Sequence, residues 1–303
     1  VRAMIKIFLA GLLIIAVFPA LSSDEVYRDA GAGAFSFLKI DPGARAAALG
    51  GTGILNSGNL AGFTNPALLA SLETGAIAVG HNQWLGDASQ NYLAWNFLAG
   101  PVTCAFGGRF LHVGNLEMRN EATSEPLDTF SAWDMSFHAA GAVRLGMFDL
   151  GLGIKIMREK IWLESSSGIA FDAGLVLHPM TNLDIAAAVQ HIGPSVTMVD
   201  NEFRLPTTWR AGARYTFGLP VGLLALSGEV RKPLDNRFSA GSGLEFTPRR
   251  WLSLRLGMRF FDDSRNLSAG MGLSAGGWIL DYAFVPVDYA MGTVHRFTLE
   301  RSL

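Results

Sequence analysis

The sequence has few charged residues, a single cysteine and, beyond its first residues, no long hydrophobic run. Charged residues make up 17% of the 303 residues, below the roughly 25% of a typical soluble domain. The only cysteine, Cys104, excludes an internal disulfide and a multi-cysteine metal site. The net charge of −2 provides no basic surface for nucleic acid, which we therefore exclude as a partner.

Hydrophobic residues nevertheless make up half of the chain. Past residue 22, no uninterrupted apolar run approaches the roughly 18–20 residues that a membrane helix needs. A chain of this composition without membrane helices is either a large soluble β protein or a membrane β-barrel.

The first 22 residues follow the pattern of a secretory signal peptide. Arg2 and Lys6 supply a short positive region, and an apolar run follows them. Ala20 and Ser22 are the small residues that a cleavage site requires. We therefore expect residues 1–22 to be a cleaved signal peptide and the rest of the chain to be exported.

From about residue 74 to residue 303, apolar residues alternate with small or polar ones. In one segment, Leu254 and Leu256 alternate with Arg255 and Gly257. This period of two is typical of β-strands with one apolar face. Fourteen segments have it, each about ten residues long, the length of a tilted membrane strand. They begin near residues 75, 89, 101, 130, 148, 168, 183, 205, 221, 237, 250, 266, 278 and 293.

The connections between these segments alternate in length. Six are tight turns built from Gly, Pro, Asn or Thr, at residues 99–101, 145–147, 179–182, 218–220, 247–250 and 275–277. The others are mostly longer and more polar, and include residues 115–129, 158–168 and 192–204. Short turns at one end and longer loops at the other predict an all-β transmembrane barrel of antiparallel strands, with both chain ends in the periplasm.

A soluble β-sandwich is the alternative, because its strands alternate in the same way. The polar face, however, is rich in glycine, serine and alanine with charges of both signs, as in a crowded, hydrated lumen. Many strands also end with aromatic residues suited to the girdles of a membrane barrel: Trp84, Trp95, Trp133, Trp209, Trp251, Trp278, Tyr282 and Tyr289. We therefore expect a bacterial outer-membrane protein with lipids around it.

Residues 23–73 lack this alternation and are rich in small residues. Residues 35–40 are expected to form a short strand, and residues 44–49 an alanine-rich helical turn that ends at Gly50 and Gly51. A segment of this kind, placed before the first strand, predicts a compact plug or hatch folded into the lumen.

A further helix is expected to begin at Asn65-Pro66-Ala67 and to run to residue 72. The side-chain oxygen of Asn65 can accept a hydrogen bond from an N–H group that the first helical turn leaves free. Pro66 at the next position has no N–H group to leave unsatisfied.

Two motifs in this segment resemble those of a known family. Residues 33–53, GAFSFLKIDPGARAAALGGTG, closely resemble the N-terminal signature of the PorV/PorQ family of outer-membrane proteins. That family is similar in architecture to the FadL fatty-acid transporters, and Asn65-Pro66-Ala67 resembles a hatch motif of both groups. The resemblance implies a fourteen-stranded barrel around a hatch. We accordingly divide the chain into a signal peptide (1–22), a hatch (23–73) and a barrel (74–303).

Two functions follow as hypotheses. The resemblance to PorV/PorQ implies a component of a type IX-like secretion and attachment system, whose partners are secretion-system proteins or secreted substrates. The alternative, which the short loops and compact size favour, is a FadL-like passive transporter with a hydrophobic ligand. In both, Gly50, Gly51, Asn65, Pro66 and Ala67 are the candidate structural or gating residues of the hatch.

The sequence points to no enzyme, cofactor or metal site. Residues 50–53 (GGTG) lie in no strand–loop–helix unit, and no lysine follows in the register of a phosphate-binding loop. Asp134 and His138 share the polar face of one strand but lie about 13 Å apart along it, too far for a hydrogen-bonded dyad. The Gly-x-Ser-x-Gly pattern of serine hydrolases is missing. We expect a non-enzymatic protein.

Charged residues on the polar face are expected to line the lumen, among them Arg210, Arg214, Arg255 and Arg259. Pairing with acidic residues across the lumen would account for them, because unpaired buried charges are costly. The alternative is that a subset lines a route or binds the carboxylate of a ligand.

Overall fold

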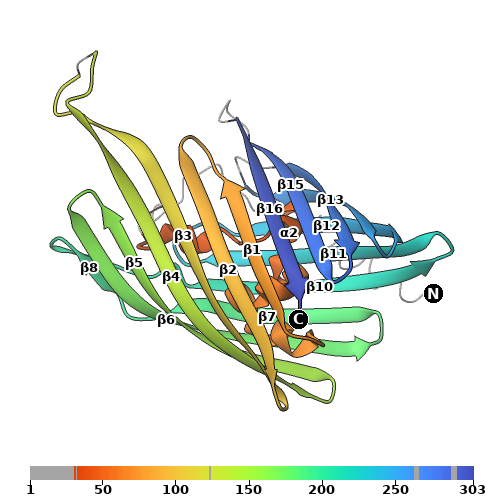
Figure 1. Cartoon of the computed structure of the whole chain (residues 1–303). Helices are drawn as coiled ribbons and strands as arrows, with labels where there is room; N and C mark the ends of the chain where they lie inside the picture. Colours follow the sequence, from red (N-terminus) through yellow and green to blue (C-terminus); the bar gives the residue numbers. More distant parts are fainter. Residues whose placement is uncertain (1–30, 32, 123, 263–265, 288–291) are drawn as a thin grey trace.

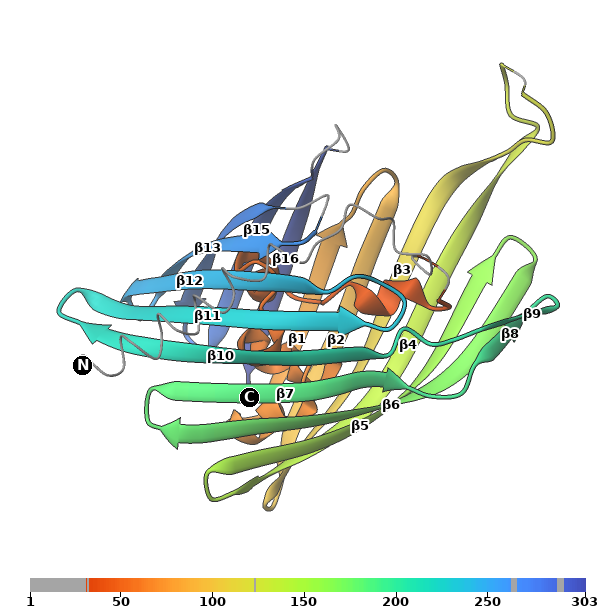
Figure 2. The ribbon, with the colours of Figure 1, turned by 180° about the vertical axis from the view of Figure 1, so that it is seen from behind.

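The computed structural model describes residues 31, 33–122, 124–262, 266–287 and 292–303. The expected signal peptide lies outside these residues, as does Tyr289. Within them, fourteen antiparallel strands close into a barrel around a set of short helices (Figures 1 and 2). The barrel strands are β1 (Ala76–Gln83), β2 (Ala88–Ala99), β3 (Val102–Met118), β4 (Asp128–Leu145), β5 (Phe148–Ile161), β6 (Glu164–Met180), β7 (Leu183–Ile192), β10 (Thr208–Leu219), β11 (Gly222–Pro233), β12 (Ser239–Arg249), β13 (Leu252–Phe260), β14 (Leu267–Ala275), β15 (Trp278–Val287) and β16 (Gly292–Ser302).

The barrel closes where β1 pairs with β16, with Ala76 opposite Ser302. The predicted strand starts agree with the observed ones; the largest difference is four residues, at β6, which begins at Glu164 rather than residue 168. The six predicted tight turns lie at one end of the barrel, the periplasmic end in bacterial barrels. The prediction of a fourteen-stranded barrel is therefore confirmed.

One of the expected outer loops is wrong, and another contains strand structure of its own. Residues 158–168 are not a loop, because β5 and β6 stay paired up to a two-residue turn at Trp162 and Leu163. Residues 192–204 contain a hairpin outside the barrel, formed by β8 (Val196–Met198) and β9 (Asn201–Phe203). Polar residues in these two segments therefore form strands that extend beyond the apolar part of the wall, at the end opposite the tight turns.

The apolar face of each strand points outward and the charged face inward. On β13, Leu256 is 62% exposed, whereas the neighbouring Arg255 is 5% exposed. A soluble sandwich would bury the apolar face, so the closed barrel decides between the two alternatives. Trp84 is an exception to the predicted aromatic girdle: it packs inside, and the Arg296 guanidinium lies 5.0 Å from its ring centre.

We predict that Leu256→Arg will lower the stability of the inserted barrel by about 2–4 kcal/mol, because Leu256 lies halfway along β13 on the lipid face. The measurement is urea unfolding in phospholipid vesicles. Leu163→Arg is the matched control, since Leu163 is also exposed but lies in the outer turn. Equal stability of the Leu256 variant and the parent would mean that lipid does not contact this face.

Inside the barrel, the described residues of the hatch form five short helices (Figure 2). They are η2 (Ser36–Lys39), α2 (Ala44–Ala48), α3 (Gly53–Asn56), η3 (Gly58–Phe63) and η4 (Pro66–Ser71), where η denotes a 3₁₀ helix. The strand expected at residues 35–40 is wrong, because a 3₁₀ turn takes its place. No described helix is both long and apolar enough to cross a membrane.

Candidate functional site

The contact between hatch and barrel wall is the candidate functional site, and its first component is a buried ion cluster. Asp41 of the hatch accepts hydrogen bonds from both terminal nitrogens of Arg210, at 2.9 and 3.0 Å. It also accepts one from Arg231 at 2.5 Å. Arg210 in turn binds Glu229 at 2.6 Å, and Glu229 accepts the backbone N–H of Ile54 at 2.8 Å. This cluster ties the hatch to β10 and β11.

Burial by itself would raise the pKa of Asp41, but the guanidinium groups of Arg210 and Arg231 outweigh it and hold that pKa well below its usual range. A carboxylate whose pKa is lowered by folding stabilises the folded state above its unfolded pKa of about 3.9. This stabilisation is lost as the pH falls below that value toward the folded pKa. The Asp41 cluster is therefore fully formed at neutral pH.

A second ion cluster joins Arg45 of α2 to the neighbouring strands β12, β13 and β15. Arg45 binds Glu245 through two hydrogen bonds of 2.9 and 2.7 Å. Arg255 links Glu245, at 2.7 Å, to Asp281, at 2.6 Å. Arg214 adds a longer contact of 3.3 Å to Glu245. Three of the four arginines predicted to line the lumen thus neutralise buried carboxylates, and the fourth, Arg259, pairs with Asp262 at 3.0 Å.

The Asn65-Pro66-Ala67 motif forms the base of the hatch. The Asn65 side chain accepts the N–H of Ala67 at 3.1 Å and so caps the helix that follows. That helix is 3₁₀ rather than α, and it packs against β4, β5 and β6. A methyl group placed on Gly174 of β6 would overlap the Asn65 side-chain oxygen. The motif therefore fits directly against the wall.

Gly50 and Gly51 end α2 with φ values of 68° and 79°, in the left-handed region that favours glycine. The N–H of Gly50 donates to the Ser268 hydroxyl at 3.2 Å. A methyl group on Gly257 of β13 would overlap the backbone nitrogen of Gly50. A side chain at position 257 therefore requires the hatch to shift, because the hatch backbone occupies the space.

The hatch thus consists of two parts. In the rear part, residues 44–72, backbone lies against wall glycines. In the front part, residues 34–41, side-chain and backbone hydrogen bonds to the wall predominate. Examples are Lys39 with Asp235, at 2.7 Å, and the Phe35 N–H with Glu159, at 2.8 Å. Together with the Asp41 cluster, these hydrogen bonds and ion pairs hold the front part.

Phe35, Phe37 and Leu38 of the front part form a buried apolar cluster with Met157 of β5 and Val196 of β8. Phe35 itself is fully buried with φ of 53°, an unusual value for a residue with a side chain. The surroundings therefore hold Phe35 in a conformation that costs free energy.

A groove of about 720 Å³, which we call the wall groove, lies directly behind this cluster. It includes side chains that face outward from the wall and others that face inward. Met135, Phe137, Ile156 and Ile169 line the groove from the outer face of the wall, whereas Met157 and the backbone of Gly168 line it from the inner face. β7 ends at Ile192, which pairs with Phe171. The residues of β6 that precede Phe171 therefore have no partner on β7 and lie next to β8 instead. The groove sits at this interruption of the wall.

Sequence reasoning places the arginines and two of their acidic partners, Glu229 and Asp281, on the inward face, but it misses Asp41 and Glu245. Asp41 lies inside the recognised motif, yet its contacts with Arg210 and Arg231 depend on how the hatch docks. Glu245 and Arg231 follow the period-two pattern, which is the signal that could have included them. Among the described residues, no group of three or more His, Cys, Asp or Glu side chains could hold a metal ion.

Comparison of the sequence with protein-family models and with curated proteins finds no match. Solved structures do match. The CymD monoaromatic hydrocarbon channel has a TM-score of 0.64 and 12% identity, over 86% of this chain and 97% of that chain. The TodX deltaS2S3 mutant monoaromatic hydrocarbon channel has a TM-score of 0.62 and 11% identity, over 85% and 96%. A Pseudomonas aeruginosa FadL homologue has a TM-score of 0.53 and 12% identity, over 86% and 97%.

These similarities define the class of the protein: it is an outer-membrane β-barrel with the fold of the FadL-like channels. The exposed apolar belt and the closed sheet agree with that location. At 11–12% identity the similarity concerns the fold, and it does not single out PorV/PorQ.

Proposed function

We propose that this protein is a non-enzymatic passive transporter that admits small hydrophobic molecules across the outer membrane. The wall groove is the observation that carries this proposal. Its apolar lining faces the lipid on one side and reaches the buried cluster around Phe35 on the other. A hydrophobic molecule in this position avoids transfer through water, which the hydrophobic effect disfavours. Channels of the same fold are named for monoaromatic hydrocarbons.

In this proposal, Gly168 is the narrowest point between groove and hatch. A methyl group at Gly168 would lie 3.1 Å from both the Phe35 ring and Val196, and 3.2 Å from Met157. A molecule that passes inward must therefore displace Phe35, and the front part of the hatch is the part that can move. The rear part stays docked in the wall.

The test is uptake of radiolabelled toluene by cells that carry the parent, Gly168→Val or Gly218→Val in the outer membrane. Gly168→Val is expected to abolish most of the protein-dependent uptake, because the added side chain fills the passage. Gly218→Val is the control, since a side chain at Gly218 meets no atom within 4 Å. Uptake by the parent no faster than by cells without the protein would refute the proposal.

A part in type IX-like secretion is the second candidate function. The resemblance of residues 33–53 to the PorV/PorQ signature favours it, and so do the ion clusters that hold the hatch in the lumen. Its partners would be secretion-system proteins or secreted substrates. Failure of toluene uptake, together with recovery of such proteins in a mild-detergent purification, would favour this candidate.

A further inference from the structure

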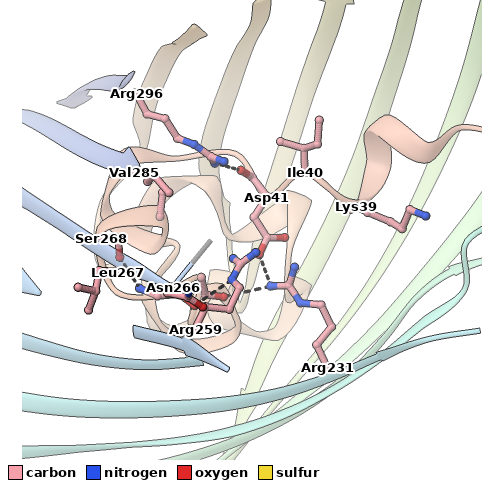
Figure 3. A pocket seen from close by; sticks show the side chains of 13 residues that line it. Lys39, Ile40, Asp41, Arg231, Arg259, Asn266, Leu267, Ser268, Val285 and Arg296 are labelled. Carbon is pink, nitrogen blue, oxygen red and sulfur yellow. Dashed lines mark hydrogen bonds and ion pairs between the residues drawn. The ribbon is translucent and has the colours of Figure 1, made fainter. Parts of the chain in front are cut away.

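Arg109 of β3 is a buried cation, 3% exposed, that makes no ion pair with any residue the structure describes. By contrast, Arg231 donates to the Asp41 carboxylate (Figure 3). Arg109 makes only two long hydrogen bonds, of 3.4 and 3.3 Å, to the backbone carbonyls of Leu38 and Ile40. None of the described residues accepts a hydrogen bond from its Nε atom.

Two acids attract Arg109 from a distance, and both are already paired with other cations. Asp172 binds Lys155 at 2.6 Å. Asp41 binds Arg210 and Arg231. Since burying an unpaired charge is costly, other groups must stabilise the Arg109 guanidinium.

The groups that do so are aromatic rings of the hatch. The guanidinium carbon of Arg109 lies 5.7 Å from the ring centre of Phe37 and 5.2 Å from that of Phe63. A cation within about 6 Å of a ring centre is attracted by the negative face of the ring, and the attraction is stronger where water is excluded. Both phenylalanines are buried. The two rings thus partly replace a counter-ion.

Arg109 also lies beyond the wall groove, on the same row of the inner wall as its narrowest point. Across β3, β4, β5 and β6 this row consists of Arg109, Ser136, Met157 and Gly168. Neighbouring strands lie about 4.8 Å apart, so three strand spacings put Arg109 about 14 Å from Gly168. Phe37 belongs to the same buried cluster as Phe35. A molecule that displaces the front part of the hatch therefore reaches Arg109 next.

We propose that Arg109 makes this passage selective for molecules with an aromatic ring over saturated hydrocarbons of the same size. Phe37, Leu38 and Ile40 all lie in the front part, so its displacement removes one ring and both carbonyls from Arg109 together. Phe63, in the rear part, stays. The ring of a ligand can then replace the ring of Phe37, which a saturated molecule cannot do. This inference rests on the proposed function, because the ligand enters from the wall groove.

The route decides between a ring and a carboxylate as the partner of Arg109. A carboxylate would attract the guanidinium more strongly, but the ligand reaches the wall groove from the lipid, where a charged group is costly. An aromatic ring is uncharged and still attracts a cation through its face. The ring is therefore the group that suits both the entry and the binding step.

The test compares uptake of radiolabelled toluene and methylcyclohexane, which share a carbon skeleton and differ in the π electrons. The cells carry the parent, Arg109→Met, Arg109→Lys or Arg249→Met in the outer membrane. Arg249→Met is the control, since Arg249 is exposed at the end of β12. In the parent and the control, protein-dependent uptake of toluene should be about tenfold faster or more, as expected for a desolvated cation–π contact.

Arg109→Met keeps the length of the side chain without its charge and should lose most of this ratio. Arg109→Lys keeps a cation and should retain part of it. Weaker docking of the hatch in these variants would change the uptake of both hydrocarbons together. The ratio of the two rates therefore reports selectivity and not docking.

The proposal is overturned if the parent takes up both hydrocarbons at equal protein-dependent rates, a result that requires no variant to assemble. It is also overturned if an assembled Arg109→Met variant keeps the ratio of the parent. Faster uptake of cyclohexanecarboxylate than of toluene, lost in Arg109→Met, would show an anion site instead. Uptake of neither hydrocarbon by the parent would refute the proposed function itself, and this inference with it.

Discussion

Arg210→Gln is expected to lower the free energy of unfolding by about 3–5 kcal/mol, the usual result of removing one partner from a buried ion cluster. The Arg210 side chain is 1% exposed and holds two carboxylates, those of Asp41 and Glu229. Glutamine cannot neutralise either of them, and Arg231 would have to serve both. The measurement is urea unfolding in phospholipid vesicles at neutral pH.

Arg214→Gln is the matched control, because Arg214 lies four residues further along the same strand. It makes one contact of 3.3 Å with Glu245, which Arg45 and Arg255 also neutralise. The loss of stability should therefore be much smaller than for Arg210→Gln. Similar losses for the two variants would show that the Asp41 cluster does not hold the hatch.

The barrel wall is the part of the fold that the sequence predicts best. Alternation of the kind seen around Leu254 and Arg255 depends only on the two faces of a strand, and tight turns depend on local residue types. Alternation and tight turns are both local signals. They predict the strands and the hairpins that connect them in order, and the barrel can be inferred without knowledge of distant contacts. The loop expected at residues 158–168 is wrong because that expectation also used only local composition. A polar segment stays in a strand when the neighbouring strand continues to pair with it.

The hatch is predicted less well because its structure depends on the wall. Residues 35–40 have strand-like composition, yet inside the barrel they find no free strand edge and form a 3₁₀ turn. The glycines of the wall illustrate the same limit. From the sequence, Gly151 and Gly270 look like positions that allow curvature, but their absent side chains make room for the backbone of Ala67 and for the side chain of Ala48. Only the docked hatch reveals that role.

The inward arginines show which part of the site the sequence pattern predicts and which part it does not. A period of two places Arg210, Arg214 and Arg255 on the inner face, and the structure agrees. Some of their partners are near in the sequence, as Glu245 is to Arg255, but Asp41 lies 169 residues from Arg210. Sequence therefore predicts that buried charges exist, whereas the three-dimensional arrangement decides which of them fix the hatch.

Deleting residues 34–72 is expected to turn a nearly closed barrel into an open channel. Those residues contain the hatch helices, and Ala44, Asn65 and Leu69 among them are fully buried by the wall. Barrels of eight strands are filled by their own side chains, whereas those of sixteen to eighteen leave an aqueous channel. An emptied barrel of fourteen strands lies nearer the second case. Its inward arginines and carboxylates would then be solvated by water rather than by the hatch.

The measurement is single-channel conductance in planar bilayers, where the deletion variant should show stable open channels and the parent almost none. Assembly of the variant is checked by the heat-dependent mobility that folded barrels show in electrophoresis. Limited proteolysis of the parent supplies the control, because a hatch inside the barrel is protected from cleavage. An assembled variant with the conductance of the parent, together with ready cleavage of the parent within residues 34–72, would show that the hatch does not close the lumen. The passage through the wall groove would then have no gate to displace.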